Sequence, residues 1–196
     1  MMKKNNSLLF GGAIAAAAFL FFGTSSAAAA PGETNIKVPV HYSLNADQIA
    51  HLMKLNPIAR DRFYNFIRYV QETLGWDVII TSSYRTFQEQ IKQYAENHHN
   101  AIPGHSFHNY GLAIDINLVK GNKRIKKASP KADWIATGVV DAATKFGLTW
   151  GGTAFSTYYD PVHFDMKKFY TSDQLQKKAI EQFGSLQNAK GNEVVL

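Results

Sequence analysis

The sequence predicts an α+β domain in which helices pack on a small antiparallel sheet. Three observations predict this class. Segments with helical apolar spacing are mixed with short runs of strand-forming residues, and the two do not alternate as regular βαβ units. No glycine-rich phosphate-binding loop is present. The length of 196 residues allows one ordinary domain and leaves no room for a second sizeable core.

Two helices open the predicted domain. Asn45 or Asp47 caps the first helix, and Pro57 suits the first turn of the second. The second helix ends at Gly75. Its apolar residues recur at three- and four-residue steps and form one buried stripe: Phe63, Phe66, Ile67, Val70 and Leu74.

The remaining elements come from the same two periodicities. In chain order they are a strand over 76–82, a helix over 86–97, a strand over 112–118, a helix over 130–147, strands over 148–150 and 163–166, and a helix over 172–183. The apolar run from Val78 to Ile80 indicates a strand buried on both faces. Ser172 or Asp173 caps the last helix.

The chain begins with the layout of a secretory signal peptide. Residues 1–30 run from a basic segment through an apolar one to a small-residue stretch that ends in alanines. Cleavage there predicts a secreted protein of the periplasm or cell wall with no stable membrane span; retention as a short membrane anchor is the alternative. Residues 31–44 then form a connection, 45–185 the folded domain and 186–196 a flexible tail.

Charge and cysteine content limit the functions. Cleavage leaves 19 basic against 15 acidic residues, a net charge of +4 that suits a polyanionic surrounding. This charge is too diffuse to indicate nucleic-acid binding, and the densest basic cluster, Lys120–Lys127, is expected to be a solvated loop. Because there is no cysteine, any metal must be held by His, Asp or Glu. The protein is expected to be a monomer.

The strand over 112–118 carries the first chemical signal. Its even-numbered residues are apolar and face the core, so Asp115 lies on the open face. Gly111 can adopt a positive φ, which lets the chain reverse and bring His108 over Asp115. In the later strand, His163 is expected on the polar face. Two imidazoles and one carboxylate form a ligand set that holds catalytic zinc and leaves a position open for water.

Two further residues fit a hydrolase built on that set. Asp160 lies three residues before His163, where its carboxylate can take a proton from the zinc-bound water and return it to a leaving amine. Arg85 follows the first strand, where its guanidinium can stabilise the oxyanion that forms when a carbonyl is attacked. A turn-forming aspartate and a surface arginine are the alternatives.

Other polar and aromatic residues stay open at this point. His105 is expected near the metal ligands or the substrate, and Asp165 either orients His163 or is simply exposed. Trp150 forms either a wall of a substrate groove or part of the core. The pair His98–His99 is expected on the surface, because neighbouring helical residues point about 100° apart and cannot easily share an ion.

Together, these residues resemble a known family. The segments that carry the resemblance are Ser83-Tyr84-Arg85, Ser106-x-His108-x-x-Gly111-x-Ala113-x-Asp115, Trp150-Gly151-Gly152 and Asp160-x-x-His163. They are similar to the signature of the M15 zinc peptidases, which cut the stem peptides of bacterial peptidoglycan.

The resemblance implies the hedgehog/DD-peptidase α+β fold and a bound Zn²⁺. It also implies a role for each matching residue: zinc ligands His108, Asp115 and His163, general base Asp160, carbonyl-polarising Arg85, and Ser106 at the edge of the substrate. Tyr84, Trp150 and His105 are expected to contact the substrate as well, although His105 departs from the family pattern.

The details favour one branch of this family. Asp160 stands where the carboxypeptidase members usually have a longer glutamate, and the segments around His108 and Trp150 resemble the L-alanyl-D-glutamate branch. We therefore expect cleavage of the L-Ala–D-Glu bond of peptidoglycan. A D-alanyl-D-alanine carboxypeptidase on the same scaffold and a non-catalytic wall-binding module are the alternatives.

Overall fold

The structure, a computed structural model, describes residues 44–155 and 158–196. The predicted signal peptide at 1–30 and the predicted connection up to residue 43 lie outside the described residues. Among those that are described, no helix combines the length and apolar character needed to cross a membrane.

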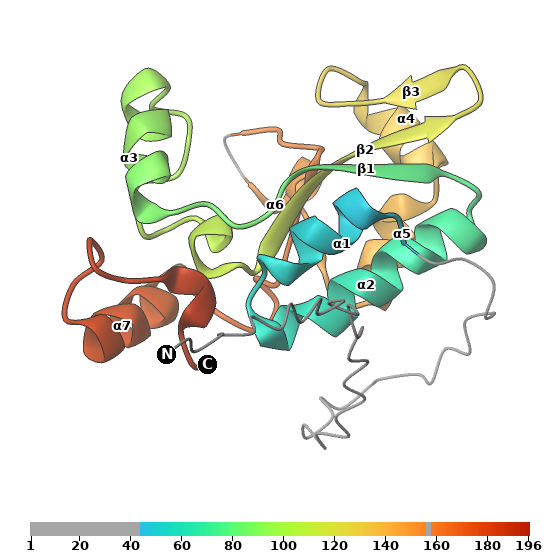
Figure 1. The fold of residues 1–196 in the computed structure, drawn as a ribbon. Coiled ribbons are helices and arrows are strands. Elements are labelled where there is room, and N and C mark those ends of the chain that lie inside the picture. Colours follow the sequence, from blue (N-terminus) through green and yellow to red (C-terminus); the bar gives the residue numbers. More distant parts are fainter. Residues whose placement is uncertain (1–43, 156–157) are drawn as a thin grey trace, which may run out of the picture. The chain divides into compact units, whose positions relative to one another are not determined.

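A five-stranded antiparallel sheet forms the centre of the fold (Figure 1). Its strands are β1 (Asp77–Ser82), β2 (Ala113–Lys120), β3 (Lys123–Ile125), β4 (Thr149–Trp150) and β5 (His163–Asp165). The order is β1-β2-β5-β4, and β3 pairs with the far end of β2. The small antiparallel sheet and its helices confirm the predicted α+β class.

Seven α-helices and two 3₁₀ turns are found in the described part of the chain. They are α1 (Ala46–Met53), α2 (Pro57–Glu72), α3 (Phe87–Glu96), α4 (Lys131–Ala136), α5 (Val139–Lys145), α6 (Gly151–Ala154), α7 (Ser172–Phe183), η1 (Phe107–Tyr110) and η2 (Gly191–Glu193). Asn45 and Asn56 cap α1 and α2, and Pro57 opens α2 as predicted, because its missing N–H needs no partner in the first turn.

The core lies between α2 and one face of the sheet. The predicted stripe of α2 is fully buried at Phe63, Phe66, Ile67 and Val70, and the Phe66 ring lies 5.3 Å from the ring of Phe164 on β5. The even-numbered apolar residues of β2 and Leu112 before it are also fully buried, as the alternation predicts: Leu112, Ile114, Ile116 and Leu118. Asp115 is thereby placed on the opposite face.

Two predicted elements differ from the structure. Val78 and Ile80 are buried, but Ile79 is 42% exposed, so β1 is covered on one face only and the expected burial on both faces is wrong. The single helix predicted over 130–147 is two helices, α4 and α5. Gly138 separates them with a φ of +79°, and the Thr137 hydroxyl accepts a hydrogen bond from Val139 N at 3.1 Å to begin α5.

Both ends of the predicted C-terminal region also need correction. Thr171, rather than Ser172 or Asp173, caps α7 through a capping box with Gln174. Residues 186–196 are not free along their whole length: η2 packs against η1, and Val194 is 2% exposed. The Asn56 amide donates a hydrogen bond to the Val194 carbonyl at 2.9 Å, so the tail is tied to the start of α2.

The basic cluster at Lys120–Lys127 is a hairpin and not only a loop. β2 and β3 pair with Lys120 opposite Lys123, and Gly121, with a φ of +56°, begins the two-residue turn between them. The short β3 strand was missed because its three residues show too little alternation to identify.

Candidate metal centre and active site

Three side chains from distant parts of the chain meet beside β2. His108 on η1, Asp115 on β2 and His163 on β5 can each offer one ligand atom to the same point. His108 Nε2 lies 3.2 Å from Asp115 Oδ1, His163 Nδ1 lies 3.2 Å from the same oxygen, and the two nitrogens are 3.1 Å apart. The pairing of Asp115 opposite His163 in the β2–β5 ladder brings these two residues together.

A backbone carbonyl fixes the ring of His108. Its Nδ1 donates a hydrogen bond to the Ser83 carbonyl oxygen at 2.5 Å, in the segment that follows β1. Because a carbonyl can only accept, Nδ1 carries the hydrogen and Nε2 presents a lone pair toward Asp115. Gly111 ends η1 with a φ of +64°, and this turn lets the chain pass from His108 into β2 as the sequence predicts.

A buried carboxylate fixes the ring of His163. Asp165 is 1% exposed, and its Oδ2 accepts a hydrogen bond from His163 Nε2 at 3.0 Å. Residues two apart on a strand share a face, which explains the contact. Of the two roles open to Asp165, the structure therefore shows the orienting one, and it leaves His163 Nδ1 free to face the other two ligand atoms.

The donor set fits a zinc ion. If both outer ring nitrogens donate and both rings are neutral, His108 and His163 point two lone pairs at each other and at a carboxylate oxygen, an arrangement that a bound cation would stabilise. Ligand atoms 2.0–2.1 Å from a tetrahedral zinc lie about 3.3 Å from one another. The three observed separations of 3.1–3.2 Å are close to that value.

The closeness of these three side chains shifts the pKa values of His163 and Asp115. Burial lowers the pKa of His163, but its hydrogen bonds to Asp115 and Asp165 outweigh that effect and raise the pKa to about 10. Burial alone would raise the pKa of Asp115, yet the charges and hydrogen bonds of His108 and His163 hold it well below its ordinary value. A proton on His163 thus occupies the place that a metal ion would take.

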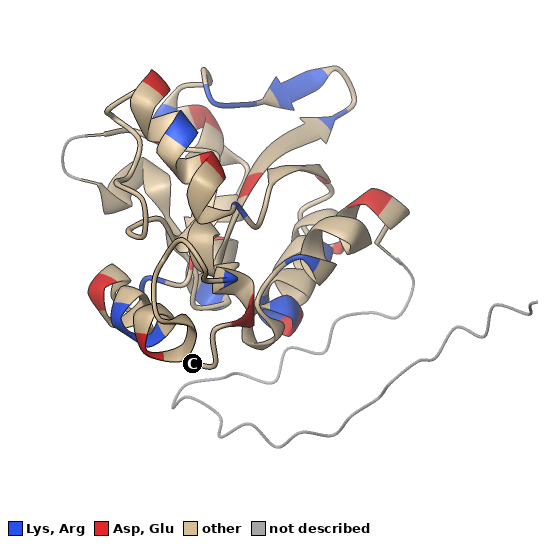
Figure 2. Cartoon of the chain, turned by 60° about the vertical axis from the view of Figure 1, so that its left-hand side comes forward, with Lys and Arg blue, Asp and Glu red and all other residues tan. Residues whose placement is uncertain are grey.

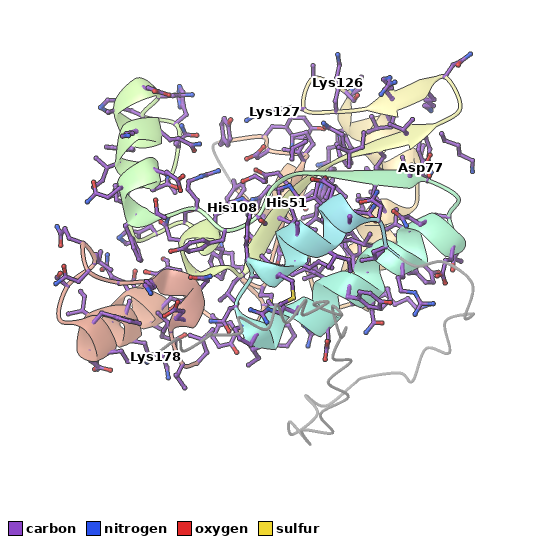
Figure 3. The ribbon with its side chains drawn as sticks, in the orientation of Figure 1. His51, Asp77, His108, Lys126, Lys127 and Lys178 are labelled. Atoms are coloured by element: carbon purple, nitrogen blue, oxygen red, sulfur yellow. The ribbon has the colours of Figure 1, made fainter. Side chains whose placement is uncertain are left out.

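A cavity of about 630 Å³ opens over the cluster. Its lining includes all three candidate ligands together with Arg85 and Asp160. Figure 3 labels His108 in this region and Lys127 above it, and Lys127 lines the same cavity. The residues that the sequence analysis placed in the reaction are therefore neighbours in space.

Arg85 is held rigidly at the cavity wall. Its Nη1 donates to the Gln90 side chain at 2.8 Å, and the fully buried Gln90 donates in turn to the Ala101 carbonyl at 2.7 Å. The backbone N–H of Arg85 donates to the His108 carbonyl at 3.0 Å. Burial lowers the pKa of Arg85, while the nearby carboxylate of Asp115 opposes this change and the group stays charged.

Asp160 lies in the loop before β5. Its backbone carbonyl accepts a hydrogen bond from His163 N at 3.2 Å, and its Oδ1 lies 3.5 Å from the ammonium of Lys127. Within the described residues, Oδ1 is buried without a hydrogen-bond partner. The carboxylate therefore retains a lone pair that can accept a proton.

The other predicted site residues divide into two groups. Ser106 and His105 line the cavity, and His105 Nδ1 lies 3.3 Å from the Ser172 hydroxyl. Trp150 is instead 3% exposed and donates from Nε1 to the Pro161 carbonyl at 2.8 Å, so of the two roles left open the structure shows a core residue. Tyr84 lines a separate shallow hollow beside α3 and is absent from the lining of the main cavity.

The cavity has an aromatic rim that was not expected from the sequence. His99, correctly expected on the surface, stacks on Tyr158 with ring planes 6° apart, and both line the cavity. Phe155 lies 5.8 Å from the ring of His163 and lines it too. These residues come from loops with no periodicity, so their sequence gave no signal of their position.

Comparisons with known proteins agree with this site. Residues 100–166, which contain all three candidate ligands, match a family described as D-alanyl-D-alanine carboxypeptidase. The peptidoglycan L-alanyl-D-glutamate endopeptidase CwlK of Bacillus subtilis (strain 168) is 32% identical over 126 residues, which are 57% of this chain and 73% of that relative.

Two solved structures are similar at lower identity. The L-Ala D-Glu endopeptidase ChiX of Serratia marcescens aligns with a TM-score of 0.47 at 21% identity, over 62% of this chain and 87% of that chain. The vancomycin-resistance D,D-dipeptidase VanXYg aligns with a TM-score of 0.44 at 21% identity, over 68% of this chain and 57% of that chain. Given the identity and coverage of the Bacillus relative, together with the matched motif region, the chain belongs to the M15 family of zinc peptidases.

Proposed function

We propose that this protein is an extracytoplasmic zinc peptidase that hydrolyses the L-Ala–D-Glu bond of peptidoglycan stem peptides. The observation that carries the proposal is the triangle of His108, Asp115 and His163, whose ligand atoms lie 3.1–3.2 Å apart. The same cavity contains Arg85 and Asp160, whose Oδ1 accepts no hydrogen bond from the described part of the chain. The Bacillus relative, named as a peptidoglycan L-alanyl-D-glutamate endopeptidase, supports the choice of bond.

The chain supplies three ligands. His108 Nε2, His163 Nδ1 and Asp115 Oδ1 would hold the zinc, and Ser83 and Asp165 keep the two rings turned toward it. When bound, zinc supplies a Lewis acid that polarises a carbonyl and lowers the pKa of a coordinated water to about 7.

Asp160 and Arg85 would do the remaining chemistry. The free lone pair of Asp160 takes the proton of the attacking water and returns it to the amine that leaves, a transfer worth roughly 10²–10⁴ in rate. Arg85, fixed by Gln90, donates to the oxygen of the attacked carbonyl as negative charge develops there. Ser106 and His105 lie on the cavity wall where they can contact the substrate.

A second candidate is a D-alanyl-D-alanine carboxypeptidase. The family that residues 100–166 match is described as D-alanyl-D-alanine carboxypeptidase, and this description favours the second candidate. The scissile bond differs in position along the stem: one activity cuts near the sugar end of the peptide and the other removes its last residue.

Mass spectrometry of muropeptides after digestion distinguishes the two candidates. Purified protein loaded with zinc is incubated with a disaccharide pentapeptide, and the products are sequenced. We expect a peptide with a new D-Glu amino terminus. Release of free D-alanine alone would support the carboxypeptidase, and no cleavage by a zinc-loaded, folded protein would support a wall-binding module.

A further inference from the structure

Residues 120–127, the tip of the β2–β3 hairpin and the segment after it, carry nearly all of the net positive charge of the chain. Without the five cations of this hairpin segment, the 21 basic residues become 16 against 15 acidic ones, and the net charge falls from +6 to +1. These cations are Lys120, Lys123, Arg124, Lys126 and Lys127. Figure 2 shows β3 and the segment beside it in blue, together with the end of β2, and residues 116–132 contain no acid.

The hairpin cations are exposed and largely unneutralised. Lys120 donates to the Leu74 carbonyl at 3.1 Å, and it and Lys123 lie over the ring of Trp76 at 5.7 and 6.0 Å. In the described part of the chain, the side chains of Arg124 and Lys126 form no ion pair. Their charges therefore face solvent.

The strand register places like charges together. Lys120 and Lys123 are direct cross-strand partners, and like charges in this position destabilise a hairpin. Lysine on a strand can protect an exposed sheet edge from aggregation. A single lysine, or an acid on either strand, would give that protection, so edge protection does not explain two lysines that face each other. An unfavourable local arrangement of this kind is typical of a functional surface.

The hairpin is continuous with the active site. Lys127 follows β3, lies 3.5 Å from Asp160 and lines the catalytic cavity. The Tyr159 hydroxyl donates to the Ser129 carbonyl at 3.3 Å and ties the loop after β3 to the loop that carries Asp160. A chain of positive charge thus runs from the hairpin turn to the mouth of the cavity.

We propose that the β2–β3 hairpin binds the carboxylates of peptidoglycan stem peptides that neighbour the peptide in the cavity. This inference rests on the proposed function for the identity of the polymer. A glutamate linked through one of its carboxyl groups keeps the other one ionised, so the polymer presents repeated anions. The hairpin would hold the enzyme on the polymer while Lys127 marks the edge of the site where one peptide is cut.

The experiment compares two variants that each lose three positive charges. The hairpin variant combines Lys123→Gln, Arg124→Gln and Lys126→Gln, and it keeps Lys120 and Lys127 with their contacts. The control variant combines Lys54→Gln, Lys145→Gln and Lys177→Gln, three exposed lysines outside the hairpin. Binding to purified sacculi stripped of phosphate-containing polymers is measured by sedimentation, and cleavage of a soluble disaccharide tripeptide is measured in parallel.

We expect the hairpin variant to bind sacculi about tenfold more weakly than the control at low ionic strength, and the difference to vanish at about 1 M salt. Its cleavage of the soluble substrate should match that of the control. Equal binding of the two variants would overturn the proposal. So would a loss confined to walls that retain phosphate polymers, because the ligand would then be phosphate. If the wild type binds sacculi but cleaves no muropeptide, the proposed function fails while the sedimentation result still decides the role of the hairpin.

Discussion

His163 Nε2 donates to Asp165 Oδ2 at 3.0 Å, and this bond decides which ring nitrogen of His163 faces Asp115. Asp165 is itself held in place, since its Oδ1 accepts a hydrogen bond from Lys167 N at 2.9 Å. A ligand that is fixed in this way needs less ordering when the metal binds, and the carboxylate makes the ring a stronger donor.

Replacing Asp165 should therefore weaken metal binding. We expect Asp165→Asn to lower zinc affinity by about 10–100-fold, because an amide holds the imidazole less firmly and adds no negative charge. Competition with a chromogenic chelator measures the affinity. Asp141→Asn, at an exposed position on α5, is the matched control and should leave the affinity unchanged. Equal affinities for the two variants would mean that Asp165 does not orient the ligand.

Replacing Asp160 should separate chemistry from metal binding. Asp160→Ala removes the proposed proton acceptor and should reduce kcat by about 10²–10⁴. Zinc content, measured by atomic emission, should stay at one per chain because Asp160 is not among the three candidate ligands. Asp160→Glu, which keeps a carboxylate, should retain more activity than the alanine variant. Undiminished cleavage by Asp160→Ala would remove this residue from the mechanism.

The metal-free protein should lose stability as the pH rises above neutrality. The folded state raises the pKa of His163 from 6.5 to about 10, so its proton stabilises the fold fully below about pH 6.5 and is lost as the pH passes through 10. Thermal unfolding in a chelator, between pH 6 and pH 10, should show a falling Tm.

Two controls assign that slope to the cluster. His163→Gln cannot titrate and should flatten the dependence, and zinc-loaded protein should show a smaller decline because the metal replaces the proton. A slope that is identical in the wild type and in His163→Gln would show that other groups cause it.

Gly191 lies in the C-terminal tail, and adding a methyl group there should disturb the metal centre. An added Cβ there would overlap the carbonyl of Asn109, the neighbour of His108. We expect Gly191→Ala to destabilise the fold by about 1–3 kcal/mol and to lower zinc affinity as well. Urea unfolding with and without zinc measures both effects. Asn188→Ala, earlier in the same tail, should change neither the stability nor the zinc affinity. Similar losses in both variants would mean that any change in the tail has this effect and that the contact of Gly191 with Asn109 is not its cause.

The candidate ligands were predictable because the signals that place them are local. Period-two alternation fixes the face of Asp115, and one glycine with a positive φ explains the approach of His108. The orienting role of Asp165 could be anticipated only as one of two options, since a strand pattern says which side chains share a face and not whether solvent covers them. Its burial depends on packing by other elements.

The features that sequence analysis missed depend on long-range contacts. Apolar spacing continues across Gly138, so the pattern gave no sign that the helix divides there. Trp150 is buried, and its indole N–H donates to the Pro161 carbonyl 11 residues away. This partner lies outside the Trp150-Gly151-Gly152 motif. Lys127 reaches Asp160 through the pairing of two loops, which no periodicity describes.

The hydrogen bond between Asn56 and Val194 joins residues 138 positions apart, and the tail that makes it also supports the turn carrying His108. A chain cut before residue 191 would keep all three candidate ligands but would lose the packing of η2 against the turn that carries His108. Integrity of the C-terminus and zinc affinity should therefore be lost together, for example on proteolysis of the tail.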